Sequence, residues 1–264
     1  MIRGLSSDLE KIIQAAKSGG QVLRKYFGQD LKIKEKSTAA DFVTKADISS
    51  EETILKILLQ SFPQYNVFTE ESDFFDKKSE YTFIIDPLDG SNNFILGIPY
   101  FSVAIALLKN NEAILAVIYN PILDNTYYAE KGRGAWLKDK KLRVNNESDI
   151  KKASVVYTCN YKTPLDYVNC LIKRLNEKKV KRILTNWCPT LDFCLLASGK
   201  IEAIINNDNE IYDFIAGKLI AREARAQITD FQGNKETNDK NSIFLATNGT
   251  EIHEELLQVL PDRK

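Results

Sequence analysis

The stretch "TFIIDPLDGSNNF", Thr82–Phe94, joins four strand-forming residues to a segment with turn chemistry. Asp-Pro-Leu-Asp-Gly is typical of a turn, because proline restricts φ and Asp-Gly tolerates left-handed backbone. The same segment places two carboxylates, Asp86 and Asp89, three residues apart after what we expect to be a buried strand. Two interpretations are open at this point: an acidic turn, or a metal site that is built on a turn.

The composition is that of an ordinary folded domain. The chain has 264 residues, of which 44% are hydrophobic and 27% charged, so it is long enough for one large domain or two tightly packed halves. Lysine plus arginine and aspartate plus glutamate both number 36, which gives a net charge of zero. Bulk charge therefore gives no support to direct nucleic-acid binding or to binding at a membrane surface.

The cysteine, histidine and apolar patterns predict a cytoplasmic protein without a zinc site. Four cysteines occur, none in a CxxC pair: Cys159, Cys170, Cys188 and Cys194. The single histidine, His253, cannot complete a Cys/His zinc set, and we expect it to be exposed on a C-terminal helix. The N-terminal segment lacks the apolar stretch of a signal peptide, and the longest apolar run, "FSVAIALL", is too short to span a bilayer.

Hydrophobic periodicity predicts mixed secondary structure. Apolar residues recur at helical spacing over Ser6–Phe27 and Ala46–Phe62, and two strand-like runs follow at Asn66–Glu71 and Tyr81–Asp86. An antiparallel meander is expected from Phe101 onward, and the second half alternates strands with helices. This order favours an α+β fold in layers, with mixed and antiparallel sheets, over a doubly wound parallel sheet.

Four acidic positions are candidates for a shared site: Glu70, Asp86, Asp89 and Asp213. Taken singly, each is explained as a turn residue, a helix cap or a solvated side chain. Taken together, carboxylates gathered at strand ends repel one another unless a divalent metal neutralises them. Oxygen donors of this kind suit Mg²⁺, and an Asp86 shared by two ions would give a two-metal site for phosphoryl chemistry.

The segment Gly90-Ser91-Asn92 adds an anion-binding hypothesis. If it enters a helix, its backbone N–H groups face an anion such as phosphate, and the Ser91 hydroxyl can orient an attacking water. A simple helix cap explains the same residues equally well.

Together these motifs resemble the inositol monophosphatase family of Mg²⁺-dependent phosphomonoesterases. The wider superfamily includes bisphosphate nucleotidases and fructose-1,6-bisphosphatases. The resemblance covers nearly the whole chain, and the motifs that carry it are "DFVTKAD" (41–47), "FTEES" (68–72), "DPLDGSNNF" (86–94), "IYDFIAG" (211–217) and "ATNGTEIHEELL" (246–257).

The resemblance implies a set of metal ligands. The side chains of Glu70 and Asp86 and the carbonyl of Leu88 would hold a first Mg²⁺. A second ion would be held by Asp86, Asp89 and Asp213. The implied reaction is hydrolysis of a phosphate monoester with water activated by two or three metal ions, and no phosphoenzyme forms.

The resemblance also implies catalytic and phosphate-binding roles. Ser91, hydrogen-bonded toward Asp47, would activate the water together with Glu70, and the amides of Gly90 and Ser91 would bind phosphate. Ser91 stands where the family usually has threonine, and it keeps the hydroxyl. Tyr212 stands in place of tryptophan before the last aspartate and should position that aspartate in the same way.

The substrate side departs from the family pattern. Trp187 and Pro189 replace small residues of the family's substrate segment, and Asn206 stands where inositol-handling members place a glutamate. Arg225 replaces a glycine after the late helix. We therefore expect Asn206 and Trp187, with Gly90 and Ser91, to bind substrate in a rebuilt pocket.

The implied architecture is a layered αβαβα sandwich of the sugar phosphatase type. Residues 1–147 would form an N-terminal half with most of the metal ligands, and residues 148–264 a C-terminal half with the last ligand and the substrate pocket, in one compact unit. The resemblance further implies a homodimer and sensitivity to lithium.

The leading functional hypothesis is hydrolysis of inositol 1-monophosphate or a similar polyol or sugar phosphate. One alternative is a 3′(2′),5′-bisphosphate nucleotidase, for which Trp187 would supply a surface that stacks on a base. The other alternative is a protein that binds a partner, such as RNA or the transcription machinery, and retains the phosphatase fold.

Overall fold

The computed structural model describes residues 6–29, 34–35, 42–72 and 74–261. Seven α-helices lie along these residues: α1 (Ser7–Tyr26), α2 (Lys45–Ser61), α3 (Ser91–Ile95), α4 (Leu165–Glu177), α5 (Pro189–Ala197), α6 (Ile211–Glu223) and α7 (Ile252–Leu257). A 3₁₀ turn, Ile150–Lys152, lies between β9 and β10.

The larger sheet has seven strands in the order β3-β4-β5-β6-β7-β8-β9. Its strands are β3 (Asn66–Thr69), β4 (Tyr81–Asp89), β5 (Ser102–Lys109), β6 (Glu112–Asn120), β7 (Asn125–Glu130), β8 (Gly134–Leu137) and β9 (Lys140–Lys141). Only β3 and β4 pair in parallel, and the others form the predicted antiparallel meander. A separate small hairpin pairs β1 (Lys34–Glu35) with β2 (Phe42–Val43).

The smaller sheet has five strands in the order β11-β10-β12-β14-β13. Its strands are β10 (Ser154–Cys159), β11 (Arg182–Leu184), β12 (Ala203–Asn207), β13 (Gln227–Thr229) and β14 (Ile243–Thr247). Strand β10 pairs in parallel with β11 and β12, and β14 pairs antiparallel with β12 and β13. The predicted boundary at 147/148 falls between β9 and β10, and the division into two halves stays a prediction.

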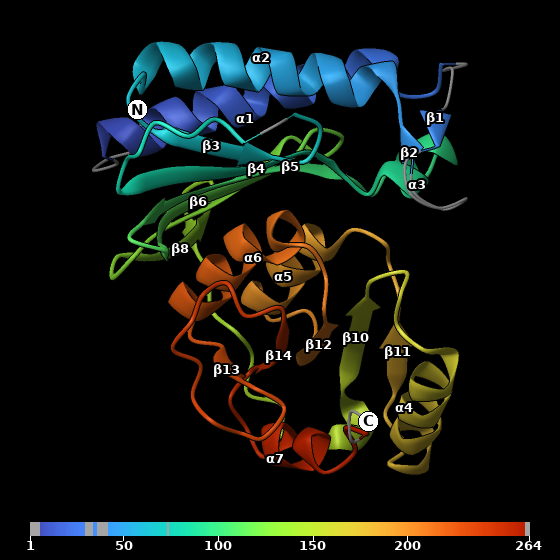
Figure 1. The fold of residues 1–264 in the computed structure, drawn as a ribbon. Coiled ribbons are helices and arrows are strands. Elements are labelled where there is room, and N and C mark those ends of the chain that lie inside the picture. The colour runs from blue at the N-terminus through green and yellow to red at the C-terminus, as the bar shows by residue number, and fades with distance from the viewer. Residues whose placement is uncertain (1–5, 30–33, 36–41, 73, 262–264) are drawn as a thin grey trace.

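The helices and sheets alternate in layers (Figure 1). Helices α1 and α2 cover one face of the larger sheet, α5 and α6 lie between the two sheets, and α4 and α7 cover the outer face of the smaller sheet. The layered α+β architecture predicted from the sequence is therefore confirmed. Because every sheet face is covered, apolar side chains on both faces of a strand are buried.

Strand β5 shows how one strand supplies two cores. Ile105 and Leu107 pack toward α1 and α2, whereas the intervening Ala104 and Ala106 pack toward α5 and α6. The α5–α6 layer is itself tightly packed, because a Cβ at Gly217 of α6 would lie 2.4 Å from the ring of Phe193 in α5. This close contact fixes the distance between α5 and α6.

The prediction that His253 is exposed is wrong. His253 lies on the predicted C-terminal helix, but it is only 1% exposed. Its ring nitrogens are each within hydrogen-bonding distance of a threonine hydroxyl, 3.0 Å from Thr229 Oγ1 and 2.9 Å from Thr247 Oγ1. Burial lowers the pKa of His253 below its ordinary value of 6.5, so the ring is neutral in the fold.

This burial predicts a pH-dependent stability. As the pH falls through 6.5, the unfolded chain takes up a proton at His253 more readily than the folded chain, and the fold loses stability. We expect His253→Gln to lose less free energy of unfolding than the parent between about pH 7.5 and about pH 5. Urea denaturation at several pH values measures the difference, and equal losses in the two proteins would contradict it.

Candidate metal centre

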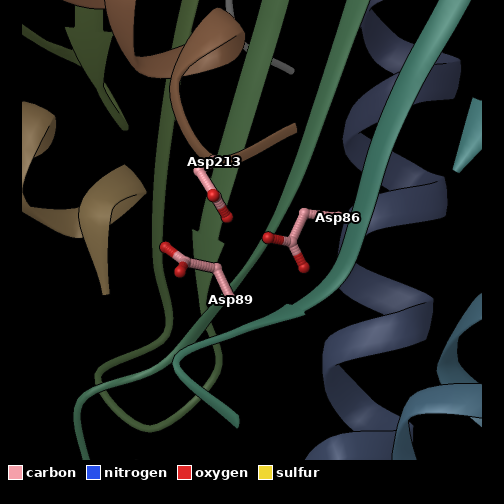
Figure 2. Close-up of side chains that lie close together, drawn as sticks. All are labelled: Asp86, Asp89 and Asp213. Atoms are coloured by element: carbon pink, nitrogen blue, oxygen red, sulfur yellow. The ribbon is translucent and has the colours of Figure 1, made fainter. Parts of the chain in front are cut away.

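Strand β4 continues through the segment that the sequence predicts to be a turn. Asp86 pairs with Ala104 and Asp89 with Ser102, so the pairing register shifts between the two aspartates. Residues three apart on a regular strand point to opposite faces, and the extra residue of a bulge reverses this alternation. Asp86 and Asp89 therefore face the same side, toward α5 and α6 (Figure 2), while Leu88 packs toward α1 and α2.

Pro87 fits this strand because its position needs no N–H donor. Strand β3 pairs with β4 only as far as Ile85, so beyond that residue one side of β4 has no neighbouring strand. The bulge is held by two other bonds: Leu88 N–H donates to Asp86 Oδ1 at 3.0 Å, and Ser50 Oγ of α2 donates to the Pro87 carbonyl at 2.9 Å.

The actual turn is at Gly90, which caps helix α3. Gly90 has φ +87°, and a Cβ there would lie 3.0 Å from the carbonyl oxygen of Tyr100. Both the left-handed backbone and the close contact require glycine. Ser91 follows as the first residue of α3 and is half-buried, and its role in binding phosphate stays a prediction.

Asp89 is held by the beginning of α5, a contact that the sequence did not predict. Asp89 Oδ2 accepts hydrogen bonds from Thr190 N–H at 2.8 Å, from the Cys188 thiol at 3.1 Å and from the Thr190 hydroxyl. Thr190 in turn bonds Ser102 on β5 at 2.6 Å. These hydrogen bonds fix the orientation of the Asp89 carboxylate despite the nearby negative charges of Asp86 and Asp213.

Asp213 reaches the same place from the first turn of α6. Its Oδ2 accepts a hydrogen bond from the Glu210 N–H at 3.1 Å, which forms part of a capping box. Carboxylate oxygens of Asp86, Asp89 and Asp213 all lie within 4.8 Å of one another (Figure 2). The helix cap and the cluster are thus one feature, and both early interpretations of Asp213 describe it.

Burial raises the pKa of all three aspartates. Burial is the largest cause in each case, and it raises the pKa of Asp89 to about 6. Neighbouring carboxylates add to the effect for Asp86 and Asp213, whose pKa values lie well above the ordinary one. Within the described ranges, no ion pair joins any of the three to a lysine or arginine.

Such a cluster fits a divalent cation. Three carboxylates turned toward one point without a cationic side chain are unfavourable when ionised, and a bound cation removes the penalty. Carboxylate oxygens are the donors that hard cations such as Mg²⁺ and Ca²⁺ prefer. The residues present therefore fit the metal ion that the sequence predicted.

Glu70 belongs to the electrostatic surroundings of this cluster. It follows the end of β3, and its charge raises the pKa of both Asp86 and Asp213. The adjacent Phe68 stacks on Tyr212 of α6 with ring centroids 6.4 Å apart, so β3 is held against the start of α6. The structure therefore brings the three aspartates together, with Glu70 close enough for its charge to act on two of them, and Glu70 as a ligand stays a prediction.

Asp47, predicted to assist catalysis, is buried in the first turn of α2. Its Oδ2 accepts hydrogen bonds from Thr44 N–H at 2.8 Å and Thr44 Oγ1 at 2.6 Å, which completes a capping box. The contact between Asp47 and Ser91 and the ligand role of the Leu88 carbonyl stay predictions. Asp41, in the first family motif, lies outside the described residues.

The predicted substrate residues differ in their surroundings. Trp187 is 60% exposed, has φ +56°, and directly precedes Cys188. Asn206 is buried, with its side chain bonded to the Ser242 carbonyl at 2.7 Å and to Asn209 at 3.1 Å. Both the NH₂ group and the oxygen of the Asn206 side chain are therefore hydrogen-bonded within the fold, whereas the Trp187 side chain is accessible from solvent.

Arg225, which replaces a glycine of the family pattern, lies away from the carboxylate cluster. This residue is exposed and follows the C-terminal end of α6, whereas Asp213 lies at the beginning of the same helix. Twelve residues of α-helix span about 18 Å. Arg225 has φ +73°, so it replaces a glycine at a left-handed helix end without lying near the metal centre.

The layered fold and the buried carboxylate cluster together define a phosphatase of the sugar phosphatase type. The model of the inositol monophosphatase family matches residues 5–264, and the chain belongs to this family. A "Fructose-1,6-bisphosphatase/inositol-1-monophosphatase" from Thermotoga maritima is 31% identical over 252 residues, which cover 96% of this chain and 95% of that protein.

Two further relatives carry a different name. A "Nus factor SuhB" from Pasteurella multocida is 34% identical over 232 residues, 84% of each chain. The crystal structure of the extragenic suppressor protein suhB from Bartonella henselae superposes with a TM-score of 0.90 at 30% identity, and covers 98% of this chain and 100% of that one. In the part of this chain that the structure describes, no helix is long and apolar enough to cross a membrane.

The charge repulsion predicts an unusual stability effect for Asp213→Asn. Asparagine keeps an oxygen that can accept the Glu210 N–H bond and removes one negative charge from the cluster. In EDTA we expect its melting temperature to exceed that of the parent by a few degrees, since 1 kcal/mol corresponds to roughly 2–4 °C in a large domain. Added Mg²⁺ should stabilise the parent and not the variant.

Scanning calorimetry with and without Mg²⁺ makes this comparison, with the exposed Asp166→Asn in α4 as control. Because the pKa of Asp213 is raised in the fold, its ionisation costs stability as the pH rises and costs nothing once it is protonated. The advantage of the variant in EDTA should therefore shrink at acidic pH. Equal melting temperatures at neutral pH in EDTA would refute the assumed repulsion.

Proposed function

We propose that this chain is a Mg²⁺-dependent phosphatase that hydrolyses a small phosphate monoester, with inositol 1-phosphate as the first substrate to test. The observation that carries the proposal is the convergence of Asp86, Asp89 and Asp213 within 4.8 Å. Relatives named inositol-1-monophosphatase, such as that of Caulobacter vibrioides at 32% identity, support the substrate class.

In this proposal the cluster would hold Mg²⁺ through the carboxylates of Glu70, Asp86, Asp89 and Asp213 and the carbonyl of Leu88. When bound, such ions lower the pKa of water and neutralise charge that develops on a transferring phosphoryl group. The protein's own part is to keep the oxygens in place before substrate arrives.

Other residues of the chain would handle the water and the phosphate. The Ser91 hydroxyl, at the start of α3, would accept and orient the attacking water, and Glu70 would take up its proton. Asp47, fixed by its own helix cap, would hold the Ser91 hydroxyl in the required rotamer. The amides of Gly90 and Ser91 would bind the phosphate, and no covalent intermediate with the protein is needed.

Removal of a proposed ligand should abolish the reaction. We expect Asp89→Asn and Asp213→Asn each to lower kcat/KM for inositol 1-phosphate by at least about 100-fold, the upper end of losses for residues that only support a ligand. Phosphate release at saturating Mg²⁺ measures this, and Asp166→Asn should retain the parent rate. Full activity in either cluster variant would overturn the site assignment.

A second candidate substrate is a nucleotide such as adenosine 3′,5′-bisphosphate. The observation that favours it is the exposed indole of Trp187, next to the Cys188 thiol that contacts Asp89. Stacking of a base on an aromatic side chain is worth about 1–3 kcal/mol. A planar base would therefore gain affinity at this position, and a polyol would not.

A substrate panel decides between the two candidates. Inositol 1-phosphate, fructose 1,6-bisphosphate, adenosine 3′,5′-bisphosphate and NADP are compared with and without Mg²⁺, in the parent and in Trp187→Ala. If a nucleotide is the substrate, its KM should rise by about 5- to 150-fold in the variant, the range set by the stacking energy, and Trp187→Phe should restore most of it. An unchanged KM for every nucleotide would exclude the stacking role.

A role in binding a macromolecular partner is a further candidate, because one relative is named Nus factor SuhB. The zero net charge gives it no support from direct electrostatic binding to nucleic acid. Complementation of a gene deletion by the inactive Asp213→Asn chain would favour it over catalysis as the cellular role.

We also propose that the enzyme is a lithium-sensitive homodimer of the cytoplasm. Family membership supports the first two properties, and the four free thiols support a reducing compartment. Light scattering coupled to gel filtration measures the oligomeric state, and inhibition by LiCl at fixed Mg²⁺ measures the sensitivity.

A further inference from the structure

Glu51, in the second turn of α2, binds the segment that carries Glu70. It is 3% exposed, and both of its carboxylate oxygens are used. Oε2 accepts hydrogen bonds from Thr69 Oγ1 at 2.7 Å and from Glu71 N–H at 3.1 Å, and Oε1 accepts one from the Ser72 hydroxyl. The residues on both sides of Glu70 are therefore bonded to one side chain.

The segment needs this support because the sheet no longer supplies it. The pairing of β3 with β4 ends at Thr69 opposite Ile85, and Glu70 follows in a bend. The negative charge of Glu70 also raises the pKa of Asp86 and Asp213, so these carboxylates repel one another. Without an anchor, that repulsion favours movement of the Glu70 segment away from the cluster.

Helix α2 anchors the other acidic segment too. Ser50, adjacent to Glu51, donates to the Pro87 carbonyl at 2.9 Å, and Pro87 lies within the bulge that carries Asp86 and Asp89. Helix α1 supports this part of α2 at close range, since a Cβ at Gly19 would lie 2.7 Å from the Ile54 side chain. Helix α2 thus bonds both to the end of β3 and to the bulge of β4.

We propose that Glu51 is a positioning residue that fixes Glu70 beside the three aspartates and thereby sets the affinity of the centre for divalent cations. This inference rests on the proposed function, because it takes Glu70 to be a metal ligand. Glu51 bonds to Thr69, Glu71 and Ser72, which flank Glu70. It would therefore affect metal binding only by holding the segment that carries Glu70.

The test is Glu51→Gln, which conserves size but turns an NH₂ group toward hydrogen-bond donors. We expect the affinity for Mn²⁺, used as a paramagnetic probe and measured by the free-ion EPR signal, to fall by about 10- to 100-fold, as is typical when a residue that supports a metal ligand is lost. The Mg²⁺ concentration for half-maximal phosphatase activity should rise by a similar factor. The matched control is Glu52→Gln, the adjacent exposed residue of α2.

If Glu51 only stabilises the fold, a folded Glu51→Gln chain should keep the parent's affinity for Mn²⁺. If Glu51 positions Glu70, saturating Mg²⁺ should restore most of kcat in Glu51→Gln, because bound cations remove the repulsion. If Glu51→Gln does not fold, Ser72→Ala, which removes one of the three donors from a partly exposed bend, should still raise the Mn²⁺ dissociation constant. Folded variants with the parent's affinity for Mn²⁺ would overturn the inference.

Failure of the inference is distinguishable from failure of the proposed function. A parent chain that binds Mn²⁺ and hydrolyses a phosphate ester, with a folded Glu51→Gln that matches it in both assays, overturns only the role of Glu51. A parent chain that binds no Mn²⁺ overturns both proposals. Loss of Mn²⁺ affinity in Glu51→Gln and in Glu70→Gln, with Glu52→Gln unchanged, supports both.

Discussion

Repulsion among buried carboxylates is the constraint on which the rest of this structure depends. Asp86, Asp89 and Asp213 are turned toward one point within 4.8 Å. Burial raises the pKa of all three, and repulsion by neighbouring carboxylates raises those of Asp86 and Asp213 further. Each is restrained by local structure: Asp86 by a bulge in β4, Asp89 by donors at the start of α5, and Asp213 by the capping box of α6. A bound divalent cation would offset the free-energy cost of gathering these charges.

The layered architecture supplies these restraints from distant parts of the chain. Helices α5 and α6 lie between the two sheets (Figure 1), so their first turns meet the end of β4 from one side. Helix α2 meets the same strand end from the other side, where Ser50 and Glu51 bond to the two acidic segments. The carboxylate cluster is thus held between two helical layers, and its geometry depends on both.

The segments around the centre differ in how firmly they are held. Asp86 and Asp89 are buried together with Cys188 and Thr190, and Asp213 is half-buried. Trp187 is exposed, and Asn206 is bonded within the fold. In the proposed function, phosphate release and the choice of substrate would therefore be carried by different parts of the chain. This separation explains why the family is evident and the substrate needs a direct assay.

The sequence by itself determined the α+β order of elements and singled out the three aspartates that the fold brings together, because hydrophobic periodicity and short acidic motifs are local signals. It failed for the exposure of His253 and gave no sign of the internal bonds of Asn206, since burial and contacts depend on which elements pack together. It also gave no sign of Glu51 or Thr190, whose partners lie far away in the chain. Only the tertiary structure decided that a bulge places Asp86 and Asp89 on one face, because strand register is set by the neighbouring strand.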